Sequence, residues 1–181
     1  MIKEQFVKTY YSMAQRAGKK YNLNPTVILA QAAHESAWGD SYSARIRRNF
    51  FGIIATAKTN EYWDGTKSAS QTNPNLIFRI YKTELDSFMD FARLISSNYK
   101  TAASVSNDST QYAKAIAYSP YISEQNGDNR PAYQKAITNN SSYIESMMVE
   151  LKKKLLCIKR VLQVDLLHCF YQGLPFTIEK G

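Results

Sequence analysis

The stretch AAHESAWGDS, residues 32–41, carries one acid on a helix built otherwise from small and apolar residues. Glu35 comes about three turns after the helix begins, near its C-terminal end, where the helix dipole disfavours a carboxylate. The neighbours Ala32, Ala33 and Trp38 offer little polar compensation. Both effects favour the protonated acid and predict a raised pKa for Glu35. A carboxyl that keeps its proton near neutral pH can donate it to a leaving oxygen, so Glu35 is a candidate general acid.

The plain alternative is an ordinary charge on a solvated helix face, which is where most helical glutamates are found. His34 is adjacent in sequence but points to another side of the helix, so we expect a surface residue, or one that supports the site indirectly, rather than a ligand. The residues around Glu35 leave both interpretations open, and the rest of the chain has to decide between them.

The composition describes a globular chain of 181 residues, with 44% hydrophobic and 21% charged residues. The thirteen tyrosines are typical either of a groove that binds sugars or peptides or of ordinary packing. The net charge of +8 is compatible with nucleic acid, an anionic membrane or an anionic wall polymer. No basic block with interleaved aromatic residues occurs, so we do not expect nucleic-acid binding.

Metal, disulfide and membrane signals are weak in this sequence. Cys157 and Cys169 have no CxxC spacing, and we interpret them as two free thiols. No His/Cys/Asp cluster has ligand spacing, so we expect no metal and no cofactor. The N-terminus lacks the apolar core of a signal peptide, and no run approaches a transmembrane length. The chain is then cytoplasmic as made, exported by another route, or a mature fragment.

Periodicity predicts a mostly helical α+β fold with a small β lobe and a substrate cleft between the lobes. Asn24 and Pro25 mark the start of a helix that runs to about Trp38, and Thr83 caps another. We expect two or three short strands between residues 40 and 81, in NFFGIIA, EYWDG and LIFRIY. Further helices are expected over residues 4–20, 108–117, 131–138 and 140–156.

The apolar spacing of the last helix continues beyond residue 156, and Gly173 and Pro175 supply a stop. We expect one domain over residues 1–156 and a C-terminal extension over 157–181, a continued helix with a short tail. An amphipathic core helix is the simple interpretation. A helix that binds a membrane surface or a partner is the alternative.

The stretch ILAQAAHESAWGDS followed by NFFGI resembles the peptidoglycan glucosaminidase family, glycoside hydrolase family 73. This is the domain of bacterial autolysins, flagellar-rod hydrolases and some phage lysins. Its pattern reads roughly A-Q-A-x-x-E-S-x-W-G, then N-L-F-G-I. The late segment YISE…AYQKAI resembles the family's Y-A-T-D-P-x-Y-A-x-K-I, and the resemblance covers about residues 4–155. The other matches are the turn Trp63, Asp64, Gly65 and the F-R-x-Y strand of Phe78, Arg79 and Tyr81.

The resemblance implies a lysozyme-like glycosidase that cuts peptidoglycan strands after N-acetylglucosamine, with Glu35 as the general acid. Tyr121 best matches the family's Y-A-T-D tyrosine, and Tyr118 is the alternative; such a tyrosine orients the substrate or stabilises the transition state. Candidate groove residues are Trp38, Phe51, Trp63 and Tyr81, although Phe51 suits a core position equally well. We expect a monomer acting on the cell wall. A phage or prophage lysin, or a truncated exported protein, would explain the missing signal peptide.

The sequence departs from the family where many members carry a second glutamate, because the comparable stretch TKSASQTNPN has no acid. Asp64 and Glu61 lie upstream, and either of them could supply the base if the loop follows a different path. A second route uses the substrate's own acetamido group as the nucleophile, and we favour it. The third possibility is a weak enzyme or a binder. The rival functions are a lytic transglycosylase using Glu35 alone and a non-catalytic wall-binding or assembly module.

Overall fold

The computed structural model describes residues 1–56, 58–124, 127 and 129–172, and side chains up to residue 156 together with Ile158. Cys169, the side chain of Cys157 and the tail over 173–181 lie outside the described part. The chain divides into two compact units, Met1–Ile144 and Glu145–Gly181. The predicted boundary between residues 156 and 157 remains a prediction.

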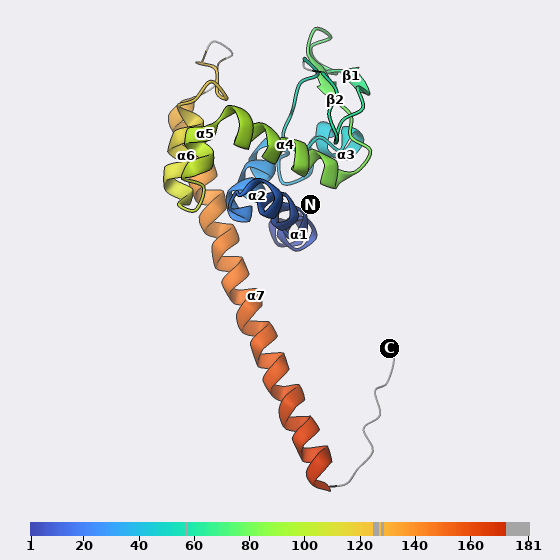
Figure 1. Ribbon diagram of the computed structural model, residues 1–181, viewed down its shortest axis with the longest axis vertical. Coiled ribbons are helices and arrows are strands. Elements are labelled where there is room, and N and C mark those ends of the chain that lie inside the picture. The colour runs from blue at the N-terminus through green and yellow to red at the C-terminus, as the bar shows by residue number, and fades with distance from the viewer. Residues whose placement is uncertain (57, 125–126, 128, 173–181) are drawn as a thin grey trace. The chain divides into compact units, whose positions relative to one another are not determined.

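The first unit is built on helices, as expected for a lysozyme-like fold (Figure 1). The helix α2 (Pro25–Glu35) packs against α1 (Lys3–Tyr21) and α6 (Ser109–Ala117), and α1 also packs against α4 (Glu84–Asn98). Every residue of α2 from Thr26 to Ala33 is buried. A helix that is apolar on all sides belongs in the centre of a fold, so α2 is the core element that carries Glu35.

The start of α2 follows the sequence prediction, and its end does not. The Asn24 side chain accepts a hydrogen bond from the Thr26 amide at 2.8 Å, and Pro25 opens the helix. The helix ends at Glu35 instead of Trp38, because residues 37 to 39 turn into the left-handed region with φ of 50°, 58° and 80°. The Ser36 hydroxyl accepts from the Gly39 amide at 2.8 Å and closes this turn. Glu35 is therefore the last residue of the helix.

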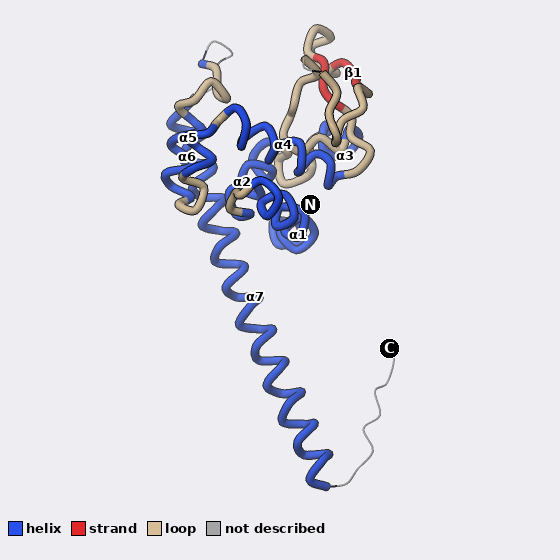
Figure 2. The backbone as a smooth tube through the Cα atoms, viewed as in Figure 1, coloured by secondary structure: helices blue, strands red, loops and turns tan. Residues whose placement is uncertain are grey.

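The predicted β lobe is mostly irregular backbone, as Figure 2 shows. The strands β1 (Lys67–Ala69) and β2 (Ile77–Arg79) pair antiparallel, and Lys67 lies opposite Arg79. The expected strands NFFGIIA and EYWDG are wrong; each contributes only an isolated bridge. The physical reason in the first case is Asn49, whose side chain bonds both the carbonyl and the amide of Ile53 and so folds the segment into a tight loop.

A buried carboxylate holds this irregular segment against α4. Asp90 Oδ2 accepts from Arg79 Nη1 at 2.6 Å and from the Tyr81 hydroxyl at 2.8 Å. Its Oδ1 accepts from Arg93 at 2.8 Å and from Asn60 at 3.0 Å. The Asp90 side chain is fully buried. The Asp90 carboxylate therefore links α4 to the end of β2 and to the turn at residues 60–63.

Three further differences from prediction concern helices. The short helices α3 (Tyr42–Arg47) and α5 (Lys100–Ser104) were not expected. The two late helices are one continuous helix, α7 (Arg130–Gln172), whose extension past residue 156 was expected. The Thr83 cap is confirmed, since Thr83 and Asp86 form a reciprocal capping box.

The second unit contains the later part of α7, in which Leu155, Leu156 and Ile158 are exposed. Within the described residues, no helix is both long enough and apolar enough to cross a membrane.

The Asp90 cluster yields a stability prediction. Asp90→Asn leaves the Arg79 charge buried and uncompensated, so we expect the free energy of unfolding to fall by about 3–5 kcal/mol. Urea unfolding at pH 7 measures this. The control Glu4→Gln removes an exposed carboxylate on α1 and should leave the free energy unchanged. A loss for Asp90→Asn no larger than that of the control would contradict the assignment.

Candidate active site

Glu35 lines a cleft of about 490 Å³. His34 lies beside it in the lining. The opposite wall comes from residues 51–54 and Leu76 of the irregular segment, and the remainder from Leu94, Tyr99, residues 120–122 and Tyr133. Among the described residues of the lining, Glu35 is the only acid, and there is no lysine or arginine. The cleft therefore offers one carboxyl in a largely apolar and aromatic surface.

Three neutral side chains from three helices lead to Glu35. The Tyr133 hydroxyl donates to Glu35 Oε1 at 2.7 Å and accepts from Gln31 Nε2 at 2.9 Å. Gln31 Oε1 in turn accepts from the Tyr112 hydroxyl. Gln31 and Tyr112 are fully buried and Tyr133 is nearly so. Glu35 thus accepts a hydrogen bond from a buried phenol.

The tyrosines around Glu35 keep their protons. Burial, reinforced by the Glu35 charge, raises the pKa of Tyr133 and of Tyr121 well above their ordinary value. Burial likewise raises the pKa of Tyr112. These hydroxyls are therefore hydrogen-bond donors throughout the neutral range.

Tyr121 and Phe51, both candidates from the sequence, lie at this cleft. The Tyr121 ring is 6.4 Å from that of Tyr133 and 5.4 Å from that of Tyr99. Phe51 stacks on Phe91 with ring centroids 3.8 Å apart. Phe51 is buried, so it serves the core and the cleft floor together.

Three other candidate groove residues lie elsewhere. Trp38 packs edge-on against Phe6 and Tyr143, and it is not among the residues of the cleft lining. Trp63 is buried, with its indole N–H donating to the Thr66 carbonyl at 2.7 Å. Tyr81 is buried beside Asp90. Burial leaves neither Trp63 nor Tyr81 a ring face for a sugar.

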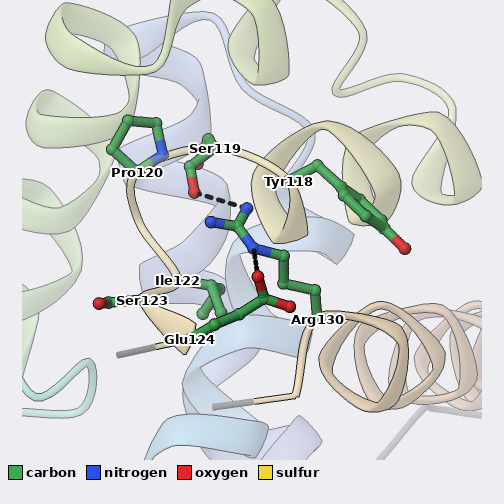
Figure 3. Close-up of a pocket in the computed structure, with 7 residues that line it drawn as sticks. All are labelled: Tyr118, Ser119, Pro120, Ile122, Ser123, Glu124 and Arg130. Atoms are coloured by element: carbon green, nitrogen blue, oxygen red, sulfur yellow. Dashed lines mark hydrogen bonds and ion pairs between the residues drawn. The ribbon is translucent and has the colours of Figure 1, made fainter. Parts of the chain in front are cut away.

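Tyr118, the alternative to Tyr121, lines a separate hollow of about 500 Å³ beside Arg130 (Figure 3). Its ring is exposed. Arg130 donates to the Ser119 carbonyl at 3.2 Å and pairs with Glu124 at 3.5 Å. These contacts hold the 118–124 segment, which carries Tyr121, against the start of α7.

Glu61 and Asp64 are engaged in ion pairs outside the cleft lining. Glu61 pairs with Lys20 at 2.9 Å, and this bond lowers the pKa of Glu61. Asp64 accepts from the Thr66 hydroxyl at 2.7 Å and pairs with Lys82 at 3.1 Å. The bonds to Thr66, with Lys82 beside them, lower the pKa of Asp64 to about 2. The described part of the cleft thus holds no second carboxylate.

Sequence reasoning missed Tyr133, Gln31 and Tyr112 as site residues. Gln31 lies one helical turn before Glu35, and Tyr133 lies within the AYQKAI match, so both had a signal. Tyr112 had none. Within the described residues, no group of three or more His, Cys, Asp or Glu is placed to hold a metal ion.

The family model described as Glucosaminidase, mannosyl-glycoprotein endo-beta-N-acetylglucosaminidase, matches residues 11–149. The chain belongs to the glucosaminidase family. The resemblance read from the Glu35 and Asn49 motifs is therefore confirmed, and this glucosaminidase is a glycoside hydrolase by family.

Curated relatives and solved structures agree with this assignment. The chain is 30% identical over 158 residues to the peptidoglycan hydrolase FlgJ of Vibrio parahaemolyticus, covering 80% of this chain and 48% of that protein. It is 31% identical over 96 residues to the exo-glucosaminidase LytG of Bacillus subtilis, covering 49% of this chain and 33% of that protein. The chain spans about half the length, or less, of the curated relatives it matches.

The fold is shared with the glycoside hydrolase domain of Salmonella typhimurium FlgJ, at a TM-score of 0.69 and 24% identity. That match covers 88% of this chain and 99% of the other. The lysozyme-like helical architecture with its small β region is confirmed.

The raised tyrosine pKa values predict an alkaline loss of stability. Burial raises the pKa of Tyr10 to about 12 and those of Tyr121 and Tyr133 well above the usual range. The same phenols ionise at about pH 10 in the unfolded chain. Their contribution is complete below pH 10, and the free energy of unfolding should fall as pH rises above it. Urea unfolding from pH 8 to 11 measures the fall. Tyr121→Phe should make it shallower, and an unchanged slope would contradict the burial of this hydroxyl.

Proposed function

We propose that this glucosaminidase hydrolyses the β-1,4 bond of bacterial peptidoglycan after N-acetylglucosamine, with Glu35 as general acid. The observation that supports it best is the position of Glu35. It ends the buried helix α2 and lines the cleft, and the Tyr133 hydroxyl holds it at 2.7 Å. The similarity to FlgJ, a peptidoglycan hydrolase, supports the substrate.

In the proposed reaction, Glu35 gives its proton to the glycosidic oxygen as the bond to the N-acetylglucosamine C1 breaks. Positive charge then develops on C1 and the ring oxygen. The aromatic and apolar wall excludes water from the other face of the sugar. Phe51, Ile54, Leu76 and Tyr99 supply that wall.

For the second group, we propose the substrate's own acetamido oxygen. It attacks C1 as the glycosidic bond breaks and closes an oxazolinium ring. Water then adds to C1, giving its proton to the Glu35 carboxylate, and the ring opens again. This route needs one protein carboxyl, which agrees with the described cleft. Glu61 and Asp64 are occupied by Lys20 and Lys82 instead. We further propose that the hydroxyl of Tyr121, which lines the cleft, orients the acetamido group.

The proposed substrate places the action at the bacterial cell wall. The net charge of +8 favours an anionic wall. We also propose that the glucosaminidase works as a monomer. Residues 157–181 are proposed as a C-terminal extension of the domain.

The acid assignment predicts that Glu35→Gln lowers the cleavage rate about 10²–10⁴-fold, because a glutamine amide is not acidic enough to protonate the leaving oxygen. New reducing ends released from purified peptidoglycan measure the rate. The exposed Glu4→Gln variant, which removes one carboxylate of similar size, should cleave at the wild-type rate. Undiminished cleavage by Glu35→Gln would overturn the assignment, and a wild type that binds the wall without cutting it would overturn the proposed activity.

The acetamido route predicts competitive inhibition by the thiazoline analogue of N-acetylglucosamine, which mimics the oxazolinium ring. The variants Asp64→Asn and Glu61→Gln should keep cleavage within about twofold of the wild type, since surface carboxylates away from the reaction contribute little to it. Inhibition constants and initial rates on peptidoglycan measure both. A loss of two orders of magnitude in either variant would instead make that carboxylate the second catalytic group.

A further inference from the structure

The hydrogen bonds behind Glu35 run in one direction. Tyr112 on α6 donates to Gln31 Oε1. Gln31 Nε2 on α2 donates to the Tyr133 oxygen at 2.9 Å, and Tyr133 on α7 donates to Glu35 Oε1 at 2.7 Å. Gln31 and Tyr112 have no exposed surface, so water does not compete for these atoms.

This direction is a consequence of the groups themselves. A glutamine side chain has an acceptor end and a donor end, and a phenol has a single hydrogen to donate. Because Tyr112 donates its hydroxyl hydrogen to Gln31 Oε1, the amide nitrogen of Gln31 faces Tyr133. The Tyr133 oxygen then accepts from Gln31, and its own hydrogen goes to Glu35.

We propose that Gln31 and Tyr112 are positioning residues that fix the direction of the Tyr133 hydroxyl and thereby decide which oxygen of Glu35 carries the catalytic proton. The inference deepens the proposed function of Glu35 and rests on it for the catalytic part. With Oε1 accepting from Tyr133, the acid's proton lies on Oε2. The Glu35 proton on Oε2 is then not engaged in a hydrogen bond to Tyr133.

The opposite arrangement shows what the two residues prevent. If the Gln31 amide turned by 180°, its oxygen would face Tyr133 and take the Tyr133 hydrogen. Protonated Glu35 would then donate to the Tyr133 oxygen, and the proton would be held away from a substrate. Tyr112 stabilises the first arrangement because its donated hydrogen bond needs the amide oxygen on its own side.

The phenols near Glu35 do not change protonation in the range where the Glu35 carboxyl is titrated. They include Tyr133 from α7, Tyr121 from the 118–124 segment and Tyr112 behind Gln31, and His34 on α2 packs against the Tyr133 ring. Burial keeps the three phenols protonated through neutral pH, and desolvation lowers the pKa of His34. A change in the Glu35 titration therefore reports on the direction of the Tyr133 hydrogen.

The test measures the titration midpoint of the Glu35 side-chain carboxyl by carbon-13 NMR in the full chain. Tyr133→Phe removes the donor to the charged form, so the midpoint should move to higher pH. Tyr112→Phe should move it the same way, because the freed amide turns and takes the Tyr133 hydrogen. The matched control Tyr10→Phe removes another buried hydroxyl that donates to a carboxylate, that of Glu84, and should leave the midpoint unchanged.

The same variants give an activity readout on peptidoglycan. In Tyr112→Phe, kcat should fall about fivefold with KM unchanged, the cost of one misdirected hydrogen bond. The alkaline limb of its pH profile should move to higher pH, which a merely structural loss would not produce.

Two results would overturn the proposal: an unchanged midpoint in Tyr112→Phe, or a midpoint that falls in Tyr133→Phe. The second would mean that Glu35 donates to Tyr133. If Tyr112→Phe does not fold, nuclear Overhauser contacts in the wild type decide, because the Gln31 amide hydrogens should contact the Tyr133 ring and not the Tyr112 ring. Shifted midpoints in a wild type that cuts no peptidoglycan would sink the proposed function and leave the hydrogen-bond direction standing.

Discussion

A carboxyl at the C-terminal end of a buried apolar helix is the constraint around which this molecule is arranged. Glu35 closes α2, where the dipole and the apolar surroundings both oppose a negative charge. No described cation lines the cleft beside it. Its partner is instead the neutral phenol of Tyr133, which Gln31 and Tyr112 support from behind. Helices α2, α6 and α7 must meet at one point to build this arrangement.

The other buried carboxylate, Asp90, has the opposite environment. It accepts from two arginines, Arg79 and Arg93, and from the Tyr81 hydroxyl. These hydrogen bonds and ion pairs fasten the irregular segment to α4. Two acids in one fold thus differ in role because their partners differ in charge. Phe51, which lies on the fastened segment, is brought to the cleft floor opposite Glu35.

The sequence predicted what local chemistry encodes. Asn24 and Pro25 mark the start of α2, and Glu35 follows about three helical turns later, near the end of the helix. The exact last residue was missed, because the Ser36 hydroxyl bonds the backbone and turns the chain early, a competition that periodicity does not record. The helical class and the family followed from ordered motifs, and the model match over residues 11–149 bears them out.

What the sequence did not predict depends on distant contacts. Trp63 and Tyr81 are residue types that often line sugar-binding grooves. Both are buried in the folded chain, and Tyr81 donates a hydrogen bond to Asp90, which the sequence alone does not reveal. Tyr112 lies 81 positions after Gln31, and no local pattern links the two. The sequence already shows that the stretch TKSASQTNPN has no acid. The structure adds that Glu61 and Asp64 form ion pairs with Lys20 and Lys82.

The central claim is that this cleft, with Glu35 as its acid, adds water across the bond after N-acetylglucosamine. Digestion of purified peptidoglycan in ¹⁸O-labelled water, followed by mass spectrometry of the fragments, tests it most directly. The account predicts fragments whose new reducing end is N-acetylglucosamine carrying one ¹⁸O atom. Fragments that end in unlabelled anhydro-muramic acid, as a transglycosylase would release, or in labelled muramic acid would contradict it.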